Sequence, residues 1–172
     1  MKNQKIKIRA LKLSDKHQLA TLVNNENIWN NLRDYIPYPY HESDAESFIN
    51  QTKKQDPQQS FGIIYKDEFC GVISLLIQND IYHKSAEIGY WIGEPYWGHG
   101  IATKAVKLIT EYGFEKLNLI RIYAGVFQHN TASMTVLEKN GYRKEGIFQK
   151  AIVKKGKILD EHRYFIVNKN PK

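Results

Sequence analysis

The chain has 172 residues, of which 42% are hydrophobic, and a formal net charge of +7. A chain of this length buries about 70% of its unfolded surface in one compact unit, so we expect a single domain over residues 1–172. It contains no run of 18 apolar residues, and its start, MKNQKIKIRA, has no apolar signal segment. We therefore expect no membrane span and no export by that route. The one cysteine, Cys70, excludes an internal disulfide, so the cytoplasm is the expected location.

The positive charge suits an anionic partner, either nucleic acid or a phosphorylated cofactor. The basic residues are scattered, however, and the one dense group, around Gly156, reads as a solvated hairpin turn formed by Lys154, Lys155 and Lys157. We therefore expect no direct nucleic-acid binding. Cys70 lies in the apolar pattern CGVISLLI, which predicts a buried, inert thiol rather than a nucleophile.

The first third of the chain predicts one strand and two helices. Lys5 to Leu13 alternates as a strand, and Ser14 with Asp15 offers caps for a helix to about Val23. The segment from Asn24 to Tyr40 is loosely organised and contains the aromatic, proline-broken run YIPYPY. On residue type alone, this run serves equally well as the wall of a substrate groove or as an aromatic patch that closes the core. A second helix follows to about Lys54, from a capping box formed by Ser43 and Glu46.

A hairpin and then a strand, loop and helix in immediate succession occupy the middle of the chain. Ser60 to Tyr65 and Cys70 to Gln78 are β-rich and joined by a polar turn. Ala86 to Ile92 predicts a central strand, and from Ile101 to Phe114 the apolar period is helical. The loop between them holds four residues that break regular structure, Gly93, Pro95, Gly98 and Gly100. Glycines directly before a helix let its free N–H groups approach a phosphate, so this loop predicts a pyrophosphate site.

Two nucleotide-binding patterns fail at this loop. The dinucleotide fingerprint needs a third glycine where Thr103 stands, and the nucleoside-triphosphate loop needs lysine where His99 stands. The remaining pattern, W-G-H-G-I-A, resembles the (Q/R)-x-x-G-x-(G/A) loop that grips the pyrophosphate of acetyl-coenzyme A in the GNAT superfamily of N-acetyltransferases. Trp97 replaces the usual Gln or Arg, as in the branch that resembles ribosomal-protein N-terminal acetyltransferases. The alternative is a tight strand-to-helix turn without a ligand.

The last third of the chain agrees with this resemblance. We expect a strand, a short helix ended by Asn140 and Gly141, and a final hairpin, at Leu119 to Phe127, Thr131 to Lys139, Tyr142 to Val153 and Lys157 to Val167. The resemblance implies the GNAT fold, an α/β (α+β) arrangement in which about four helices flank a twisted, mixed, mostly antiparallel sheet of about seven strands. It covers the chain from about Lys5 to Asn168.

Acetyl transfer to an amine needs a base, and Glu87 is the best carboxylate for that task. It lies in the predicted central strand before the loop and matches the position where many GNAT enzymes carry their glutamate base. Alternation places it on one face with Gly89 and Trp91. Burial of a carboxylate is costly unless the group is used, because it moves the pKa of a carboxylate toward the range that a base needs. A structural carboxylate bonded to the loop near Tyr82 and His83 is the alternative.

The resemblance also implies the residues that hold acetyl-CoA. Backbone N–H groups of Trp91, Ile92 and Gly93 are expected to bind pantetheine and the thioester oxygen, because GNAT strands splay there. The pyrophosphate is expected to bind at the loop and the first helical turn, where His99 offers its backbone rather than acting as a catalyst. Asn130 matches the asparagine that contacts the cofactor. The full set expected at the pyrophosphate is Gly98, His99, Gly100, Ile101, Ala102 and Thr103.

The general acid departs from the family pattern. Many relatives have a tyrosine seven residues after the asparagine, but Leu137 stands there in this chain. Ser133 is the nearest hydroxyl and matches a serine of the ribosomal-protein branch. Ser133 either orients a water molecule or the sulfur, or its hydroxyl forms a hydrogen bond with the backbone of its own helix. Asp160 and Glu161 either attract the ammonium form of the acceptor or are solvated hairpin charges.

We therefore expect an acetyl-CoA-dependent N-acetyltransferase that moves acetyl directly to a primary amine, foremost the N-terminal amine of a protein such as a ribosomal protein. Polyamines, small amines, or a non-catalytic CoA-binding module are the alternatives, since a fold alone does not assign a substrate. The six histidines form no H-E-x-x-H or cysteine–histidine cluster, so we expect no metal. A homodimer through a sheet edge or the final hairpin is compatible with the sequence.

Overall fold

The computed structural model describes residues 6–171, and the contacts within the chain divide it into two compact units. Unit 1 takes in the chain up to Ser74 together with Tyr90–Leu108, and unit 2 takes in Leu75–Gly89 together with the chain from Ile109 onward. Two strands and one helix contribute residues to both units. The single domain expected from chain length stays a prediction.

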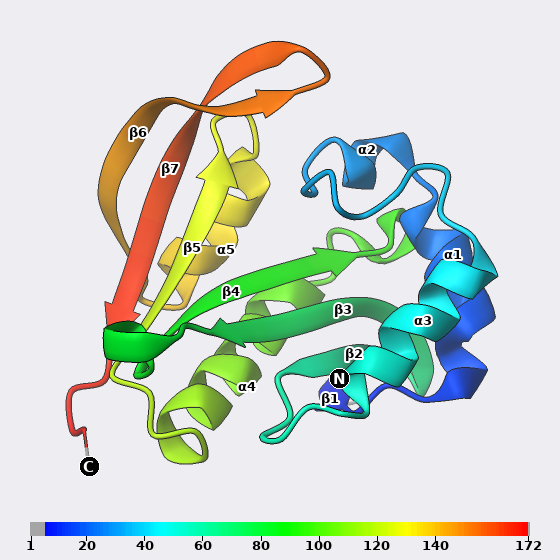
Figure 1. The fold of residues 1–172 in the computed structure, drawn as a ribbon, viewed down its shortest axis with the longest axis horizontal. Coiled ribbons are helices and arrows are strands. Elements are labelled where there is room, and N and C mark those ends of the chain that lie inside the picture. The colour runs from blue at the N-terminus through cyan, green and yellow to red at the C-terminus, as the bar shows by residue number, and fades with distance from the viewer. Residues whose placement is uncertain (1–5, 172) are drawn as a thin grey trace. The chain divides into compact units, whose positions relative to one another are not determined.

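A seven-stranded sheet is the central element, with the strand order β1-β2-β3-β4-β5-β7-β6 (Figure 1). Its pairs are antiparallel at β1–β2, β2–β3, β5–β7 and β6–β7, whereas β4 and β5 run parallel. The mixed, mostly antiparallel sheet predicted from the sequence is therefore confirmed. The strands are β1 (Lys7–Arg9), β2 (Ser60–Tyr65), β3 (Glu68–Ile77), β4 (Ser85–Ile92), β5 (Arg121–Phe127), β6 (Arg143–Lys154) and β7 (Lys157–Val167).

Within residues 6–171, five α-helices accompany the sheet, one more than the sequence indicated. They are α1 (Lys16–Val23), α2 (Glu26–Trp29), α3 (Glu42–Thr52), α4 (Ile101–Glu115) and α5 (Thr131–Lys139), with short 3-10 turns at Leu13–Asp15, Asp80–Tyr82 and Glu94–Tyr96. The additional helix is α2, a single turn in the segment that looked irregular. The side chain of Asn25 caps it by accepting the N–H groups of Asn27 and Ile28.

Two predicted helix caps are wrong, because the carboxylates concerned have other partners. Asp15 precedes α1 without capping it, since its carboxylate accepts hydrogen bonds from Arg9 and from the N–H of Lys12. At α3 the cap is His41, whose N–H donates to Asp44 at 2.8 Å, and Ser43 with Glu46 plays no such part.

Strand ends differ from the prediction by a few residues. β1 is shorter than the alternation indicated and runs only from Lys7 to Arg9, while Lys5 lies outside the described residues. β3 begins two residues earlier than expected, at Glu68, because the turn of its hairpin is confined to Lys66 and Asp67, both with positive φ. Tight turns of this kind leave more residues for pairing.

Unit 1 has its core where α1 and α3 pack beside the strands of the first hairpin. Apolar side chains from these elements form one buried cluster that includes Leu19, Ile49, Ile64 and Phe69. The aromatic segment before α3 contributes Tyr40, which is 8% exposed. Tyr35 and Tyr38 of the same segment are exposed, and Tyr38 stacks on Trp29 at 5.0 Å. The segment therefore both closes the core and presents aromatic rings to solvent.

Unit 2 is organised around the second half of α4 and the strands β5 and β7. Gly113 on α4 allows close packing, because a Cβ there would lie 2.8 Å from Leu75 and 2.9 Å from Ile122. Thr110 of the same helix shares a 2.7 Å hydrogen bond with the hydroxyl of Tyr142. One face of β5 is buried against this core, at Ile122, Ala124 and Val126, and the alternate residues form a more exposed face.

The β6–β7 hairpin ends unit 2, and its turn lies at Lys155 and Gly156, as predicted (Figure 1). Lys154 is the exception to the solvated turn expected there, since it is only 5% exposed. It is the last residue of β6 and points to the face opposite that of Val153, which is 66% exposed.

We expect Asp15→Asn to destabilise the protein at neutral pH by about 1–2 kcal/mol, the scale of lost hydrogen bonds to a charged group. Burial raises the pKa of Asp15, but the hydrogen bonds from Arg9 and Lys12 outweigh it and hold the pKa below its usual value. The stabilisation is therefore present above the unfolded-state pKa and disappears as the pH falls through the folded-state value.

Urea unfolding between pH 7 and pH 2 measures the difference in the free energy of unfolding between wild type and Asp15→Asn. This difference should narrow below about pH 4. The matched control is Asp67→Asn, because Asp67 also pairs with a β1 cation, Lys7, but its side chain is 89% exposed. We expect no measurable change in that variant. If Asp15→Asn and Asp67→Asn lose equal free energies of unfolding, the contribution that we assign to the buried pair of Asp15 is wrong.

Candidate functional site

The glycine-rich loop in unit 1 has the backbone geometry of an anion site. Gly98 and Gly100 both have positive φ, +80° and +70°, and α4 begins at the next residue, Ile101. Among residues 6–171, and apart from the two chain neighbours, no atom lies within 4 Å of the position that a Cβ would occupy at either glycine. Left-handed residues directly before a helix turn successive N–H groups toward one concave point, where the helix dipole also favours negative charge. The loop can therefore accept a pyrophosphate.

Two side chains, Glu94 and Tyr96, fix the loop just before these glycines. The carboxylate of Glu94 accepts hydrogen bonds from the side chains of Asn25 and Asn27. The hydroxyl of Tyr96 donates to Glu68 at 3.0 Å, and burial together with this bond raises the pKa of the phenol. Sequence reasoning missed these contacts, because the partners lie 28 or more residues apart.

Trp97, the residue that replaces the family's usual Gln or Arg, also fixes the loop. Its indole N–H donates to the carbonyl of Ile92 at 2.7 Å, and its side chain is half-exposed. The bond ties the end of the loop back to the end of β4. The family's Gln or Arg is a polar side chain that could reach a ligand, whereas Trp97 forms a hydrogen bond within the protein.

The other loop and helix residues predicted to hold the pyrophosphate lie in the first turn of α4 or beside it. Ile101 is buried, at 2% exposure, and anchors the helix start, while Ala102 and Thr103 are half-buried. His99 is exposed; its Nδ1 lies 3.3 Å from the carbonyl of Tyr96 and its ring is tilted against Tyr65. This placement agrees with a backbone role for His99.

The end of β4 corrects one expectation about the thioester site. The N–H of Gly93 already donates to the carbonyl of Cys70 at 2.8 Å, so it is not available for a ligand. A glycine is needed there for packing, because a Cβ would lie 2.8 Å from Leu22. Trp91 and Ile92 remain the candidate backbone groups on this strand.

Glu87 lies in unit 2, half-buried in β4 and directly opposite Tyr123 of β5. This is the last residue pair of the parallel ladder, although β4 continues to Ile92 and β5 continues to Phe127. The carboxylate therefore stands where the two strands stop pairing. The alternation predicted for β4 is confirmed, since Ala86 and Ile88 on either side are buried.

Sequence reasoning missed Tyr123 as the neighbour of Glu87. The pattern that could have found it is Arg-x-aromatic, which occurs at Arg121 and Tyr123 and again at Arg163 and Phe165. Residues two apart on a strand share a face. The repeat therefore places two arginines and two aromatic rings on one face of adjacent strands.

Asn130 and Ser133 are brought together at the start of α5 in unit 2. The side chain of Asn130 caps this helix by accepting the N–H of Ser133 at 3.2 Å. Leu137, which stands where relatives carry a tyrosine, is fully buried in the core. A tyrosine hydroxyl at that site would lose its contact with water, so the leucine agrees with its surroundings.

Asp160 and Glu161 are not solvated hairpin charges. Asp160 accepts the N–H of Lys150 at 2.8 Å, and its own N–H donates to Gln128. Glu161 forms a 2.6 Å ion pair with Arg163, and its carboxylate covers Gly125, where a Cβ would lie only 2.7 Å away. Of the two, Asp160 holds the hairpin in place.

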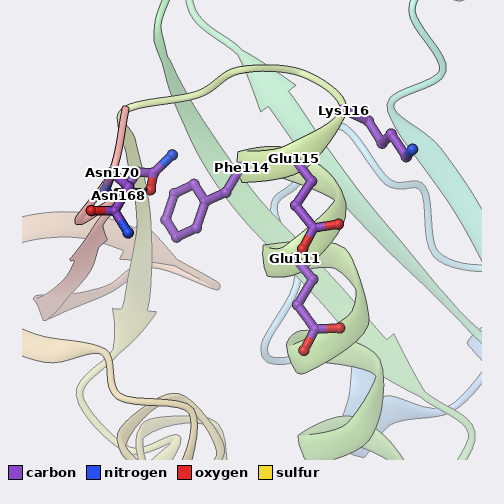
Figure 2. Close-up of a pocket in the computed structure, with 6 residues that line it drawn as sticks. All are labelled: Glu111, Phe114, Glu115, Lys116, Asn168 and Asn170. Atoms are coloured by element: carbon purple, nitrogen blue, oxygen red, sulfur yellow. Dashed lines mark hydrogen bonds between the residues drawn. The ribbon is translucent and has the colours of Figure 1, made fainter. Parts of the chain in front are cut away.

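A surface pocket of about 550 Å³ lies elsewhere in unit 2, at the C-terminal end of α4. Figure 2 shows Phe114 directed toward Asn168 and Asn170, with Glu111 and Glu115 along the helix beside it. None of the residues predicted to act in acetyl transfer lines this pocket. We therefore do not assign the reaction to it.

The described part of the chain offers no group of three or more His, Cys, Asp or Glu side chains that could hold a metal ion. Cys70 is buried as predicted, and burial raises the pKa of its thiol to about 12. In the same residues, no helix is long and apolar enough to cross a membrane.

Comparison with known proteins identifies the family. The acetyltransferase (GNAT) domain family matches residues 5–143. The N-acetyltransferase YnaD of Bacillus subtilis is 36% identical over 80% of this chain and 81% of its own length. The putative ribosomal N-acetyltransferase YdaF of the same organism is 31% identical over 84% of this chain and 81% of its own.

Solved structures agree with this assignment. The microcin C7 self-immunity acetyltransferase MccE, in complex with acetyl-CoA and AMP, is 29% identical and has a TM-score of 0.82 over 96% of this chain and 94% of its own. Spermidine N-acetyltransferase from Vibrio cholerae, in complex with CoA and spermine, is 27% identical with a TM-score of 0.80 over 94% and 95%.

The chain therefore belongs to the GNAT family of acetyltransferases and has its fold. It is an N-acetyltransferase that uses acetyl-CoA as the donor.

Proposed function

We propose that this enzyme transfers acetyl directly from acetyl-CoA to the N-terminal amine of a protein, such as a ribosomal protein. The observation that carries direct transfer is Glu87, a half-buried carboxylate at the last paired residue of β4 and β5. The likeness to YdaF, a putative ribosomal N-acetyltransferase, supports the choice of acceptor. The exposed rings of Tyr35 and Tyr38 offer a peptide apolar contacts in unit 1.

The predicted residues other than Gly93 have the following roles in this proposal. The N–H groups around Gly98 and Gly100 hold the pyrophosphate, and backbone groups of Trp91 and Ile92 hold pantetheine and the thioester oxygen. Glu87 removes the proton that the amine must lose before it attacks the thioester carbonyl. Asn130 orders the start of α5 and contacts the cofactor. Ser133, on the same turn, orients the departing thiolate or a water that protonates it.

Polyamines are the second candidate class of acceptor. The likeness to spermidine N-acetyltransferase, 27% identical over nearly the whole of both chains, is the observation that favours them. The net charge of +7 opposes them, because a free polycation is repelled by a positively charged protein.

We expect the reaction to take place in the cytoplasm. A homodimer is compatible with the fold, since β6 is an edge strand and its hairpin exposes Val153 and Ile158. An unpaired, apolar edge is a common site of association between copies of a chain.

Steady-state release of CoA thiol against a panel of acceptors tests this proposal. The panel contains N-terminal peptides, spermidine and spermine, and aminoglycoside antibiotics, each with saturating acetyl-CoA. We expect the peptides to have a kcat/KM at least about tenfold above that of the polyamines, a difference of about 1.4 kcal/mol in transition-state binding. A polyamine as the best acceptor would instead assign the enzyme to the second class.

A further inference from the structure

Arginines and aromatic rings alternate across the open face of β5, β7 and β6 in unit 2. The guanidinium of Arg163 lies 4.2 Å from the ring centroid of Phe148 and 5.2 Å from that of Tyr123. Arg121 lies 5.8 Å from Tyr123 and 4.7 Å from Phe165. These distances are all within the range of cation–π attraction.

Arg143 completes this arginine–aromatic ladder, with its guanidinium 5.2 Å from the ring of Phe165. The ladder therefore has six members, which are Phe148, Arg163, Tyr123, Arg121, Phe165 and Arg143. Two rings contact each of Arg121 and Arg163, and one ring contacts Arg143. Such aromatic contacts restrict the rotation of a guanidinium. Such groups are preorganised to bind planar anions.

The ladder begins directly beside the proposed base. The strand register places Glu87 opposite Tyr123, Tyr123 opposite Phe165, and Phe165 opposite Arg143. Residues paired across strands share a face, so these four side chains form one row. Three strand spacings separate the two ends of the row, a distance of about 14 Å.

The three guanidiniums differ in how their charges are compensated. Arg121 pairs with Glu145 at 2.5 Å, and Arg163 pairs with Glu161 at 2.6 Å. Arg143 is exposed, and no carboxylate lies within ion-pair distance of it among residues 6–171. Of the three arginines, Arg143 is therefore the one whose charge no carboxylate compensates, and it lies at the far end of the row.

We propose that Arg143 is a specificity-determining residue that selects acceptors carrying an anionic group about 14 Å from the reacting amine. The inference rests on the proposed function, because Glu87 defines where the amine lies. An acceptor bound over Tyr123 and Phe165 brings a carboxylate or a phosphate to Arg143, where a guanidinium binds either with paired hydrogen bonds. A polyamine lying in the same direction brings a second ammonium there and is repelled.

The distance translates into a position along a peptide. An extended chain advances about 3.3 Å per residue, so 14 Å corresponds to about four residues. The preferred peptide acceptor therefore has an acidic residue at about its fifth position. A phosphate at the same distance satisfies the same requirement, whether on a peptide or on a nucleotide-like acceptor.

Four peptides that differ at one position test the proposal. They carry Asp, Asn, Lys or phosphoserine at position five, and kcat/KM for each is measured by CoA thiol release. We expect wild type to prefer Asp over Asn about five- to tenfold, the range for a partly exposed charge-assisted hydrogen bond, and to disfavour Lys. The phosphoserine peptide tells whether a phosphate serves as well as a carboxylate.

Variants at the end of the row separate specificity from catalysis. Arg143→Gln should abolish the preference for Asp over Asn, and Arg143→Glu should make Lys the preferred residue. The control is Lys144→Gln, because Lys144 is the next residue of β6 and pairs with Tyr164 on the opposite face. That variant should retain the preference of wild type.

The possible failures are distinct. If wild type acetylates all four peptides equally, the role of Arg143 is wrong while the proposed function stands. The same holds if Lys144→Gln abolishes the preference and Arg143→Gln retains it. If no peptide is acetylated, the proposed function and this inference fail together.

Discussion

A Glu87→Gln variant is expected to acetylate its peptide acceptor about 10² to 10⁴ times more slowly than wild type, which is the usual contribution of a general base. Glutamine keeps the size and polarity of the side chain but cannot take up a proton. The change should appear in kcat at saturating substrates, measured by CoA thiol release. Because the loop in unit 1 is unchanged, the Kd for acetyl-CoA, measured by calorimetry, should remain that of wild type.

The pH dependence of this variant separates a base from a structural carboxylate. An N-terminal amine loses its proton in solution at about pH 8. Raising the pH from about 7 to 9 should therefore narrow the gap between variant and wild type, since more of the acceptor arrives unprotonated. Glu115→Gln, at an exposed position on α4, is the control and should behave as wild type. A constant gap at all pH values would assign Glu87 a structural role.

Replacing both loop glycines, Gly98→Ala with Gly100→Ala, is expected to weaken acetyl-CoA binding by about 30-fold to 700-fold. A residue with a Cβ in the left-handed region costs about 1–2 kcal/mol, and 1.4 kcal/mol corresponds to tenfold in Kd. Apart from the adjoining residues, none of the described residues has an atom within 4 Å of either new Cβ, so the loss comes from backbone conformation and from crowding of the ligand. Calorimetric titration with acetyl-CoA measures the effect.

Gly156→Ala provides the matched control for the loop. Gly156 also has a positive φ, +72°, and an open Cβ position, but it lies in the β6–β7 turn. Gly156→Ala should lower the free energy of unfolding by about as much as each of the two loop replacements does. It should leave the Kd for acetyl-CoA unchanged. Unchanged binding in the Gly98 and Gly100 double variant would exclude this loop as the pyrophosphate site.

The parts of the fold that the sequence predicted best are those whose pattern is local in the sequence. The bounds of β2, α5 and β7 agree residue for residue with the prediction, and α4 differs by one residue at its end. β2 is a short apolar run that is buried at every residue, and α5 buries Met134 and Leu137 at helical spacing. β7 starts directly after the turn at Lys155 and Gly156, which fixes its first residue.

Other features depended on contacts between distant residues, and the sequence alone did not predict them. The capping potential of Asp15 was visible, but its pairing with Arg9 of β1 was not. The helix α2 was missed because one turn, capped by Asn25, is too short to show a period. Local rules are overridden where a side chain finds a stronger partner elsewhere in the chain.

The candidate site shows the same division. The turn at Gly98 and Gly100 was predictable, because positive φ is what glycines before a helix commonly provide. Two hydrogen bonds were not predictable, the one from Trp97 to Ile92 and the one from Gly93 to Cys70. Both depend on how β3, β4 and the loop meet in unit 1. The arginine–aromatic ladder likewise needs the order β5-β7-β6, which no single strand reveals.

The most direct test of the proposed function is to locate the acetyl group on a product. The enzyme is incubated with acetyl-CoA and a peptide that has a free N-terminal amine and an internal lysine, and tandem mass spectrometry then identifies the modified nitrogen. Our account predicts one acetyl group on the N-terminal amine, lost in Glu87→Gln, and none on the enzyme itself. Acetyl on the lysine side chain, or acetylation of spermidine in preference to the peptide in a mixture of both, would contradict it.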